Sequence, residues 1–337
     1  MDFSFLQGKR VLVTGGTGFV GRHLLPELLR VGASVTCLAR ASSNVSRLPQ
    51  DVHIVRADLT SGEGLTAALT GQDAVVHMAA LLFGLGWQDY LRANARAAET
   101  LARAAAAAPS VQRVVLVSSL AATGPSNSSP GVRDTDAPAP VSAYGWSKFM
   151  AEQIFGRHLG DRLVTLRPPI IYGSGDQGLL PCFQAAQRGL LVSPGLHRPF
   201  PVSAVHARDM AQAVMHCLRD KAHGAYHIND GHEYTMRAFS EAIGTAVGRK
   251  AHVLGVPLPV MAVAAAASTL GSQLLARLGC GGRRAPSWNM DKYREAKQLG
   301  WLCDAARIQE ELGYAARMTL PDGMAEAVAG YRKEGWL

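Results

Sequence analysis

Short apolar runs alternate with longer amphipathic stretches through the first half of the chain. The runs are rich in valine and show no alternation of apolar and polar residues, which is typical of strands in a sheet covered on both faces. They predict strands at residues 9–14, 34–38, 52–55, 74–77, 114–118 and 163–166. Helical spacing predicts helices at 20–31, 93–108 and 142–159, the first with Pro26 in its interior. Strands and helices in this order predict an α/β fold with a doubly wound parallel sheet.

The second half of the chain differs in composition. After residue 172, proline and glycine become frequent, as at Pro181, Gly189 and Pro194. This change predicts a Rossmann-type domain at residues 1–172 and a smaller C-terminal substrate-binding lobe at 173–337, with some segments returning to the first domain. With 48% hydrophobic and 18% charged residues, the chain can bury a full core, which excludes global disorder.

One stretch of the second half, residues 253–276, contains no Asp, Glu, Lys or Arg. It is long enough to span a bilayer, but Pro257 interrupts its start. Three interpretations stay open: a spanning helix, a helix that lies on a membrane or covers the substrate mouth, and an ordinary packed helix. In the second, Arg277, Arg283 and Arg284 would meet lipid headgroups.

Charge and cysteine content exclude several classes of function. The chain has 34 Lys and Arg against 26 Asp and Glu, a net charge of +8, but no basic stripe interleaved with aromatic residues, so no nucleic-acid partner is expected. The five cysteines form no Cys-x-x-Cys pair, so neither a metal site nor a disulfide framework is expected. The N-terminus has no signal-peptide pattern, so we expect a cytoplasmic protein, with membrane association through residues 253–276 left open.

A glycine-rich turn lies between the first predicted strand and the first predicted helix. It reads Thr14-Gly15-Gly16-Thr17-Gly18-Phe19-Val20-Gly21. Glycines let the backbone approach a diphosphate closely, and the first N–H groups of the following helix point at the phosphate. The turn therefore predicts a dinucleotide site whose contacts are Gly15, Thr17, Gly18, Phe19, Val20 and Gly21.

The end of the second strand indicates which dinucleotide binds. An acidic residue there would bond the ribose 2′-hydroxyl of NAD, but the chain has Arg40. A guanidinium pairs with a 2′-phosphate, so Arg40 favours NADP(H), with NAD(H) as the alternative. Asp58 and Leu59, after the third strand, are expected at the adenine edge, and Ala79 and Ala80, after the fourth, beside the cofactor's ribose.

The candidate catalytic residues are Ser119, Tyr144 and Lys148. Tyr144 and Lys148 lie four residues apart on one predicted helix and share a face. A phenol with a pKa near 10 is a poor base at neutral pH, and a neighbouring ammonium would lower that pKa. Tyr144 could then exchange a proton with a substrate hydroxyl or carbonyl. Ser119, just after the fifth strand, would hydrogen-bond the same substrate oxygen.

Together these motifs resemble the extended short-chain dehydrogenase/reductases of the NAD-dependent epimerase/dehydratase superfamily. The resemblance covers nearly the whole chain and rests on Thr14-Gly15-x-x-Gly18-x-x-Gly21, Asp58-Leu59, His77-x-Ala79-Ala80, Ser118-Ser119, Tyr144-x-x-x-Lys148, Leu166-Arg167-Pro168, Val205-His206-x-x-Asp209 and Leu312-Gly313-Tyr314. It implies that Ser119, Tyr144 and Lys148 form the catalytic triad and that Lys148 also reaches the nicotinamide ribose.

The resemblance also implies further cofactor contacts and a dimer. Pro168 and Ile171 would pack by the nicotinamide, and Asn94 would lie near the cofactor. Two helices per subunit, residues 93–108 and 142–159, would form the interface of a homodimer. The first offers a small-residue face at Ala97, Leu101, Ala104 and Ala108, whose alternative role is to pack on the sheet.

Two departures narrow the chemistry within the family. Sugar-nucleotide 4,6-dehydratases have Asp-Glu directly after the triad hydroxyl residue, where this chain has Leu120-Ala121, so dehydration is not expected. Sugar-nucleotide epimerases usually have Asn three residues after the Arg of the Leu-Arg motif, where this chain has Ile170. The pattern is similar to the branch of the 3β-hydroxysteroid dehydrogenases and dihydroflavonol reductases, which implies a dehydrogenase or a ketone or aldehyde reductase.

The expected substrate is hydrophobic. The loop at residues 81–87 follows the fourth strand and has no charged side chain, which suits an uncharged substrate, although a core role is the alternative. The candidate substrate contacts are Leu81, Phe83, Trp87, Thr123 and Tyr172. We therefore expect an NADP(H)-dependent oxidoreductase acting on a hydrophobic carbonyl or alcohol. An NAD-dependent sugar-nucleotide epimerase and a non-catalytic NAD(P)-binding protein are the alternatives.

Overall fold

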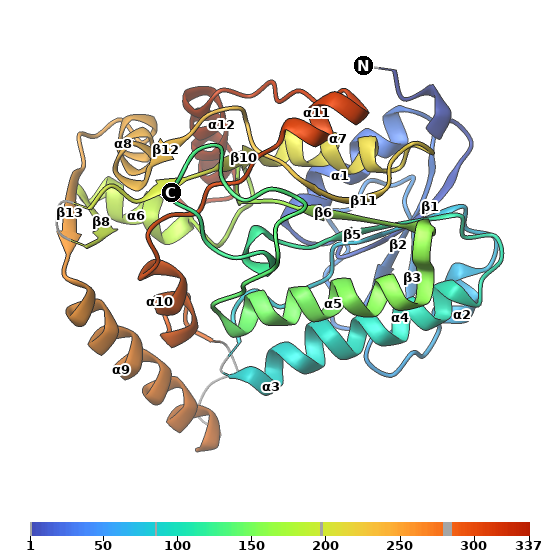
Figure 1. The fold of residues 1–337 in the computed structure, drawn as a ribbon, viewed down its shortest axis with the longest axis horizontal. Helices are drawn as coiled ribbons and strands as arrows, with labels where there is room; N and C mark the ends of the chain where they lie inside the picture. Colours follow the sequence, from blue (N-terminus) through green and yellow to red (C-terminus); the bar gives the residue numbers. More distant parts are fainter. Residues whose placement is uncertain (1, 85, 196–197, 279–284) are drawn as a thin grey trace.

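A seven-stranded parallel sheet forms the centre of the protein (Figure 1). The computed structural model describes residues 2–84, 86–195, 198–278 and 285–337. The strand order is β11-β6-β5-β4-β1-β2-β3, and every neighbouring pair is parallel. These strands are β1 (Arg10–Thr14), β2 (Ser34–Ala39), β3 (His53–Arg56), β4 (Ala74–His77), β5 (Arg113–Val117), β6 (Leu163–Arg167) and β11 (Gly224–His227). The fold class and the six predicted strands are confirmed, and β11 is a seventh strand that the sequence pattern did not indicate.

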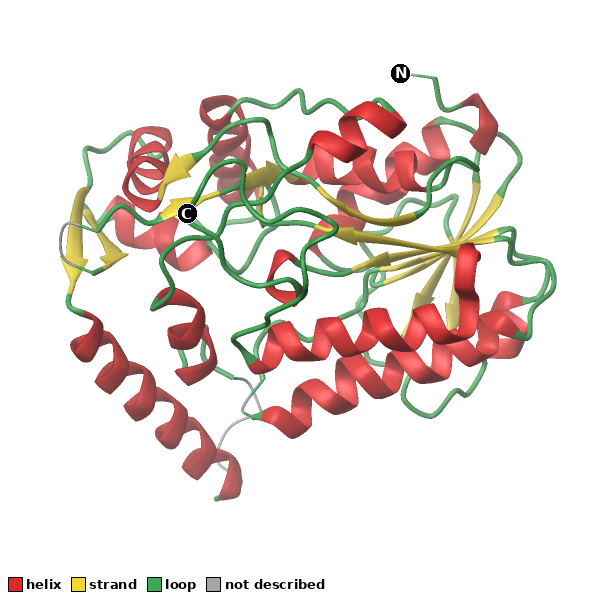
Figure 2. Cartoon of the chain, in the orientation of Figure 1, coloured by secondary structure: helices red, strands yellow, loops and turns green. Residues whose placement is uncertain are grey.

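Helices cover both faces of this sheet, as Figure 2 shows. One face carries α1 (Phe19–Arg30) and α7 (Ala207–Cys217), and the other carries α2 (Leu65–Leu69), α4 (Ala97–Ala106) and α5 (Ala143–Leu159). Neighbouring residues of one strand join different cores: Val11 and Val13 pack under α1 and α7, whereas Leu12 packs under α4 and α5. Both kinds of position are apolar because both faces are buried, which explains the absence of alternation.

Two predicted helices differ locally from expectation. Helix α1 continues through Pro26, which lies on the exposed side, so the carbonyl group left without a donor can reach water. The helix predicted at 93–108 starts earlier, with a short turn α3 (Trp87–Tyr90) and a π-helical segment (Leu91–Arg96) that leads into α4.

The small-residue face of α4 is only partly covered within the subunit. Ala97 and Leu101 are buried, Leu101 in the core that α4 and α5 share with the sheet, whereas Ala104 and Ala108 are half-buried against that core. The homodimer through this face stays a prediction.

The second half of the chain forms a smaller lobe of short strand pairs and helices. Its strands are β7 (Ile170–Tyr172), β8 (Leu190–Pro194), β9 (Pro201–Val202), β10 (Ala204–His206), β12 (Tyr234–Thr235) and β13 (His252–Val256). Its helices are α6 (Leu180–Gln187), α8 (Met236–Ala246), α9 (Leu258–Arg277), α10 (Met290–Ala296) and α12 (Leu320–Lys333). A separate core around Phe183, Phe239 and Tyr331 stabilises it. Helix α7, strand β11 and helix α11 (Ala306–Leu312) return to the sheet.

The apolar stretch at residues 253–276 is not a single helix. Its first residues form strand β13, which pairs with β8, and helix α9 begins only at Leu258. Pro257 and Pro259 explain the break, because the residue before a proline avoids helical geometry, whereas proline itself is accepted in a first helical turn. In the described part of the chain, α9 is the one helix with the length and composition of a membrane span.

Candidate active site

The glycine-rich turn packs against the ends of three strands. Gly15 has a φ of +75°, and a side-chain carbon there would lie 2.7 Å from the backbone nitrogen of Ala79 after β4. A side-chain carbon at Gly16 would lie 2.7 Å from the Sγ of Cys37 in β2, and one at Gly21 would collide with the carbonyl oxygen of Gly16. The turn therefore requires glycine at these positions. A side chain there would also fill the space in which a ligand could contact the backbone of the turn.

The N-terminus of α1 is open to an anion. Gly18 caps the helix without a side-chain hydrogen bond, and the first turn contains no acidic residue. The predicted contacts Thr17, Phe19 and Val20 lie in this turn and are partly buried. Free N–H groups and the helix dipole favour negative charge here, so the residues present fit a dinucleotide diphosphate.

Arg40 follows β2 and has an unengaged side chain. It is exposed, and in the described part of the chain its guanidinium makes no hydrogen bond or ion pair. Arg56 instead shapes this loop by donating to the Arg40 carbonyl oxygen at 2.6 Å. The N–H group of Thr60, 2.6 Å from Asp58, holds the pKa of that carboxyl below its usual value, and Arg40 acts in the same direction. Leu59 packs against the core under α4 and α5.

A buried hydrogen bond holds the end of β4 beside the glycine turn. The Oγ1 of Thr14 lies 2.7 Å from the Nδ1 of His77, and the Ala79 N–H donates to the same Oγ1 at 3.3 Å. Burial, followed by the charge of Lys148, lowers the pKa of His77 to about 3, so the ring is neutral at pH 7. Ala79 and the exposed Ala80 are thereby held at the edge of the cradle.

Two hydroxyl groups, those of Ser119 and Tyr144, meet where β5 ends and α5 begins. Ser119 caps a short turn, Leu120–Ala122, and its Oγ accepts a hydrogen bond from the Ala121 N–H at 3.1 Å. The Ser119 side chain also lies close enough to Tyr144 to lower the pKa of that phenol. One substrate oxygen could therefore be bound by both hydroxyl groups.

Tyr144 has opposing influences on its acidity. Its side chain is buried, and burial raises the pKa of the phenol above its ordinary value. Lys292 and, after it, the Ser119 side chain act in the opposite direction, and Glu295 acts with burial. The Lys292 ammonium lies 4.9 Å from the centre of the Tyr144 ring and pairs with Glu295 at 2.8 Å. The phenol thus keeps its proton at neutral pH, and the Lys292 ammonium is close enough to stabilise the phenolate once that proton is lost.

Lys148 makes a different contact from the one expected. Its Nζ donates to the carbonyl oxygen of Val117 at 2.6 Å, and the side chain is buried. Burial lowers the pKa of Lys148 to about 8, partly offset by Glu152. Among the described residues, the cation that acts on Tyr144 is Lys292. The tuning role expected of Lys148 stays a prediction for the cofactor-bound enzyme.

Helix α10 fastens the beginning of α5. The Asp291 carboxylate accepts the N–H groups of Ala143 at 2.6 Å and Tyr144 at 3.1 Å. Glu295 accepts the hydroxyl of Ser142, the residue that caps α5, at 2.7 Å. One helix of the lobe therefore positions the candidate catalytic residue Tyr144 by its backbone and places a cation beside its ring. The sequence analysis missed this helix, because its charged residues look like those of any exposed helix.

Apolar side chains surround the Tyr144 ring. Leu81, Tyr90 and Trp301 pack with it in one cluster. Asn94 holds Leu81 in place by accepting its N–H at 2.7 Å and donating to its carbonyl oxygen at 3.1 Å. Because Asn94 is buried and its polar groups are engaged within the protein, it positions this loop.

The other predicted contacts on the loop at residues 81–87 lie nearer the surface. The Phe83 ring centre is 5.7 Å from the Lys292 ammonium, which also contacts the Tyr144 ring. Trp87 begins α3 and is 41% exposed. Leu85 lies outside the described residues.

The predicted contacts beyond this loop fall in the interior. Thr123 is buried and donates to the Leu120 carbonyl oxygen at 2.9 Å. Tyr172 is fully buried in the core of the lobe. Their assignment as substrate contacts is therefore corrected, because no face of either side chain is free. The Pro168 carbonyl accepts the Leu120 N–H at 2.8 Å and so supports the Ser119 turn, and Ile171 packs against the core under α1.

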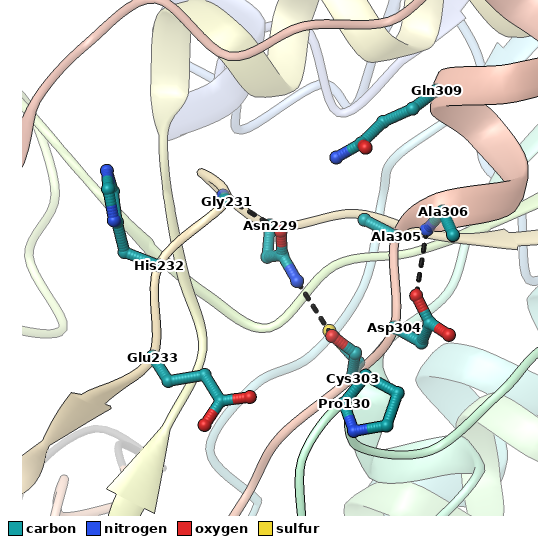
Figure 3. Close-up of a pocket in the computed structure, with 10 residues that line it drawn as sticks. All are labelled: Pro130, Asn229, Gly231, His232, Glu233, Cys303, Asp304, Ala305, Ala306 and Gln309. Carbon is teal, nitrogen blue, oxygen red and sulfur yellow. Dashed lines mark hydrogen bonds between the residues drawn. The ribbon is translucent and has the colours of Figure 1, made fainter.

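A cavity of about 190 Å³ is formed by other residues (Figure 3). It is lined by Pro130, Asn229, Gly231, His232, Glu233, Cys303, Asp304, Ala305, Ala306 and Gln309. Two of its polar side chains are engaged in loop structure: Asn229 donates to the Cys303 carbonyl oxygen at 2.7 Å, and Asp304 accepts the Ala306 N–H at 2.9 Å. No residue of the triad or of the glycine turn lines it, so we do not assign it to the active site.

The sequence model of the NAD dependent epimerase/dehydratase family matches residues 11–230. The chain belongs to this family. It is 30% identical over 335 residues to the ceramide reductase of Caulobacter vibrioides, covering 97% of this chain and 96% of the relative. It is 31% identical over 267 residues to a 3β-hydroxysteroid dehydrogenase/Δ5→4-isomerase of Mycobacterium tuberculosis, covering 72% and 70%. A solved dTDP-glucose 4,6-dehydratase of Streptomyces venezuelae, with NAD bound, has a TM-score of 0.76 at 25% identity, covering 97% and 98%.

As a member of the NAD-dependent epimerase/dehydratase family, the protein is an NAD(P)-dependent oxidoreductase of the short-chain dehydrogenase/reductase type. The resemblance stated from its motifs, including the likeness to 3β-hydroxysteroid dehydrogenases, is confirmed. The two residues after Ser119 stand where the 4,6-dehydratases of this family have Asp and Glu. In this protein they are Leu120 and Ala121, which are buried and apolar. The carboxylates of Asp291 and Glu295 are engaged by α5 and Lys292.

Proposed function

We propose that the protein is an NADP(H)-dependent reductase of a ketone or aldehyde on a hydrophobic small molecule, or a dehydrogenase of the corresponding alcohol. The observation that carries the proposal is the surroundings of Tyr144: a buried phenol that is protonated at neutral pH, lies near the Ser119 side chain and is surrounded by apolar side chains. A protonated phenol is a general acid for a carbonyl oxygen. An apolar wall suits an uncharged substrate better than a sugar nucleotide with two phosphates.

The named substrates of the two relatives support the same class. Ceramide and a 3β-hydroxysteroid are both hydrophobic molecules, and the name of the first relative describes a reduction. The ceramide reductase matches 97% of this chain, so the lobe that packs against Tyr144 is included in that comparison.

Residues of the chain itself bind the substrate oxygen and donate a proton to it. A dinucleotide bound with its diphosphate on the glycine turn would supply the hydride from its nicotinamide. Tyr144 and Ser119 donate hydrogen bonds to the carbonyl oxygen, and Tyr144 transfers its proton as that oxygen becomes negative. The Lys292 cation stabilises the phenolate that remains. Lys148 of α5, whose Nζ reaches the end of β5, is the residue expected to hold the nicotinamide ribose.

The preference for NADP(H) rests on Arg40. Its guanidinium is exposed and unengaged, whereas the neighbouring Arg56 is committed to the loop backbone. A 2′-phosphate would give Arg40 a charge-assisted partner, and a 2′-hydroxyl would not.

The proposal is tested by following NADPH oxidation by the purified protein with a homologous series of ketones. Catalytic efficiency should rise with chain length until the pocket is full, because each buried methylene adds at most roughly 0.8 kcal/mol. Ser119→Ala should lower the rate for every ketone alike, since it acts on the shared carbonyl oxygen. Interconversion of a UDP- or GDP-sugar without net cofactor change would overturn the proposal in favour of an epimerase.

A further inference from the structure

Helix α9 turns its apolar side chains away from the protein. Val263, Leu270, Leu274 and Leu278 are each more than half exposed, with Val263 at 70%. They recur at intervals that place them on one side of the helix, which lies along an edge of the molecule (Figure 1). A surface helix of a water-soluble region shows the opposite arrangement, with its apolar stripe against the core.

The polar residues of α9 lie on its inner side. Four of them are half-buried: Ser268, Thr269, Ser272 and Gln273. The Oγ1 of Thr269 accepts the Met290 N–H at 3.0 Å, and the Trp288 indole donates to the Met261 carbonyl oxygen at 3.4 Å. The polar side of α9 packs against the lobe, and its apolar side is therefore left exposed.

The attachment also excludes a bilayer-spanning role for α9. Strand β13, just before the helix, pairs with β8, and α10, just after it, packs on α5. Both ends of α9 thus belong to one packed lobe. The contacts of Trp288 and Met290 run along the side of the helix. A single span would place the two ends on opposite sides of a membrane, so the exposed stripe suits a helix that lies on a surface.

The strand pair β8–β13 extends the apolar surface. Leu190, Val192 and Leu254 are about half exposed, whereas their strand neighbours Leu191 and Val253 are buried. Val192 and Leu254 are partners in the register, so the exposed side chains share one face. Along the chain, only Pro257 separates strand β13 from helix α9.

Basic residues border this surface. Arg249 and Lys250 precede β13, Arg277 ends α9, and all three are exposed. Residues 251–290 contain no Asp or Glu. Arg283 and Arg284, also expected at headgroups, lie outside the described residues. Apolar side chains bordered by cations complement a bilayer with anionic headgroups, whereas a second copy of this chain would bring cations against cations.

We infer that α9 and the β8–β13 pair dock this protein onto the surface of a bilayer that contains anionic phospholipid. The adjoining α10 carries the Lys292 that contacts Tyr144, so docking brings the catalytic groups to the membrane side of the lobe. This second point rests on the proposed function. A hydrophobic substrate dissolved in the bilayer then reaches the site without crossing water.

The test uses the full chain and two kinds of vesicle, phosphatidylcholine alone and phosphatidylcholine with phosphatidylglycerol, with binding measured by co-sedimentation. We expect at least roughly tenfold tighter binding to the anionic vesicles. The double variant Leu270→Asp/Leu274→Asp should lose at least about tenfold of that binding. Leu299→Asp, which replaces a leucine of similar exposure outside the surface, is the matched control and should bind like the wild type. Absence of binding to both vesicles, or equal loss in the control, overturns the inference.

Activity with a short, water-soluble ketone separates this inference from the proposed function. The double variant should keep that activity, because its two leucines are not part of the catalytic machinery. Vesicle binding without reduction of any ketone rejects the proposed function and supports docking. Ketone reduction without vesicle binding rejects docking alone. Resistance to alkaline extraction from the vesicles would indicate a spanning helix. A dimer that the double variant abolishes would indicate that a second copy of the chain covers this surface. Either result overturns docking.

Discussion

Replacing Lys292 by methionine removes the cation beside Tyr144 and keeps an apolar stem of similar length. The ammonium lies 4.9 Å from the centre of the phenol ring. Two unit charges about 5 Å apart attract each other by about 3 kcal/mol at an effective dielectric constant of about 20. Glu295, 2.8 Å from the ammonium, cancels part of this attraction. We therefore expect the phenolate of the variant to be less stable by roughly 1–2 kcal/mol.

The assay is the pH dependence of alcohol oxidation, in which the phenolate acts as the base. In the wild type, kcat/KM rises with pH as the phenol ionises. In Lys292→Met this rise should move to higher pH, by roughly one pH unit for each 1.4 kcal/mol lost. The difference between the two enzymes should narrow at alkaline pH, where both phenols are ionised. Ketone reduction at neutral pH should fall by the same factor as oxidation, because the variant cannot change the overall equilibrium.

Two further variants distinguish charge from packing. Lys292→Arg keeps a cation at this position and should retain most of the wild-type pH dependence. Lys297→Met removes an exposed lysine at the end of the same helix and should change nothing. A rise that stays at the wild-type pH in Lys292→Met, or that moves equally in Lys292→Arg, would refute the electrostatic argument. Melting temperatures establish that each variant is folded.

Three other changes test separate parts of the structure. Arg40→Asp should weaken NADPH binding by roughly 1–3 kcal/mol in calorimetric titration and leave NADH nearly unaffected; equal losses would contradict the role of Arg40. Tyr144→Phe should abolish turnover while cofactor fluorescence still reports binding, because only the transferable proton is lost; substantial residual activity would remove Tyr144 from its role. Glu152→Ala should lower the free energy of unfolding in urea by roughly 3–5 kcal/mol, because the buried Arg167 guanidinium, bonded to it at 3.1 and 2.7 Å, loses its counter-charge; a loss below about 1 kcal/mol would show that the pair behaves like an exposed one.

The sequence by itself determined the dinucleotide half of the site, because that half is local. A strand, a glycine turn and a helix follow one another within a few residues, and the steric demands of Gly15 and Gly21 come from the turn itself and its adjacent strands. Tyr144 and Lys148 share a face because one helix carries both. The valine-rich runs predicted the central sheet for a similar reason, since burial on both faces is visible in each strand alone.

The residues that surround Tyr144 were decided by the tertiary structure alone. Asp291 lies 147 residues after Tyr144, yet it binds the Tyr144 backbone, and Lys292 follows it. No short window of sequence distinguishes α10 from another charged helix, because its role depends on where the lobe folds against α5. Lys292, the cation that contacts Tyr144 in the structure, is therefore one that spacing did not suggest.

The same limit applies to helix faces. The small residues of α4 suit either a partner helix or the core of the subunit, and the structure buries two of the four and leaves the other two half-buried. The composition of α9 suits a packed, a spanning or a surface helix, and only its contacts with Trp288 and Met290 show which side faces out. Local patterns determine which elements form, because backbone and neighbouring side chains set those preferences. Which face is covered depends on distant segments of the chain, and therefore only the folded structure decides it.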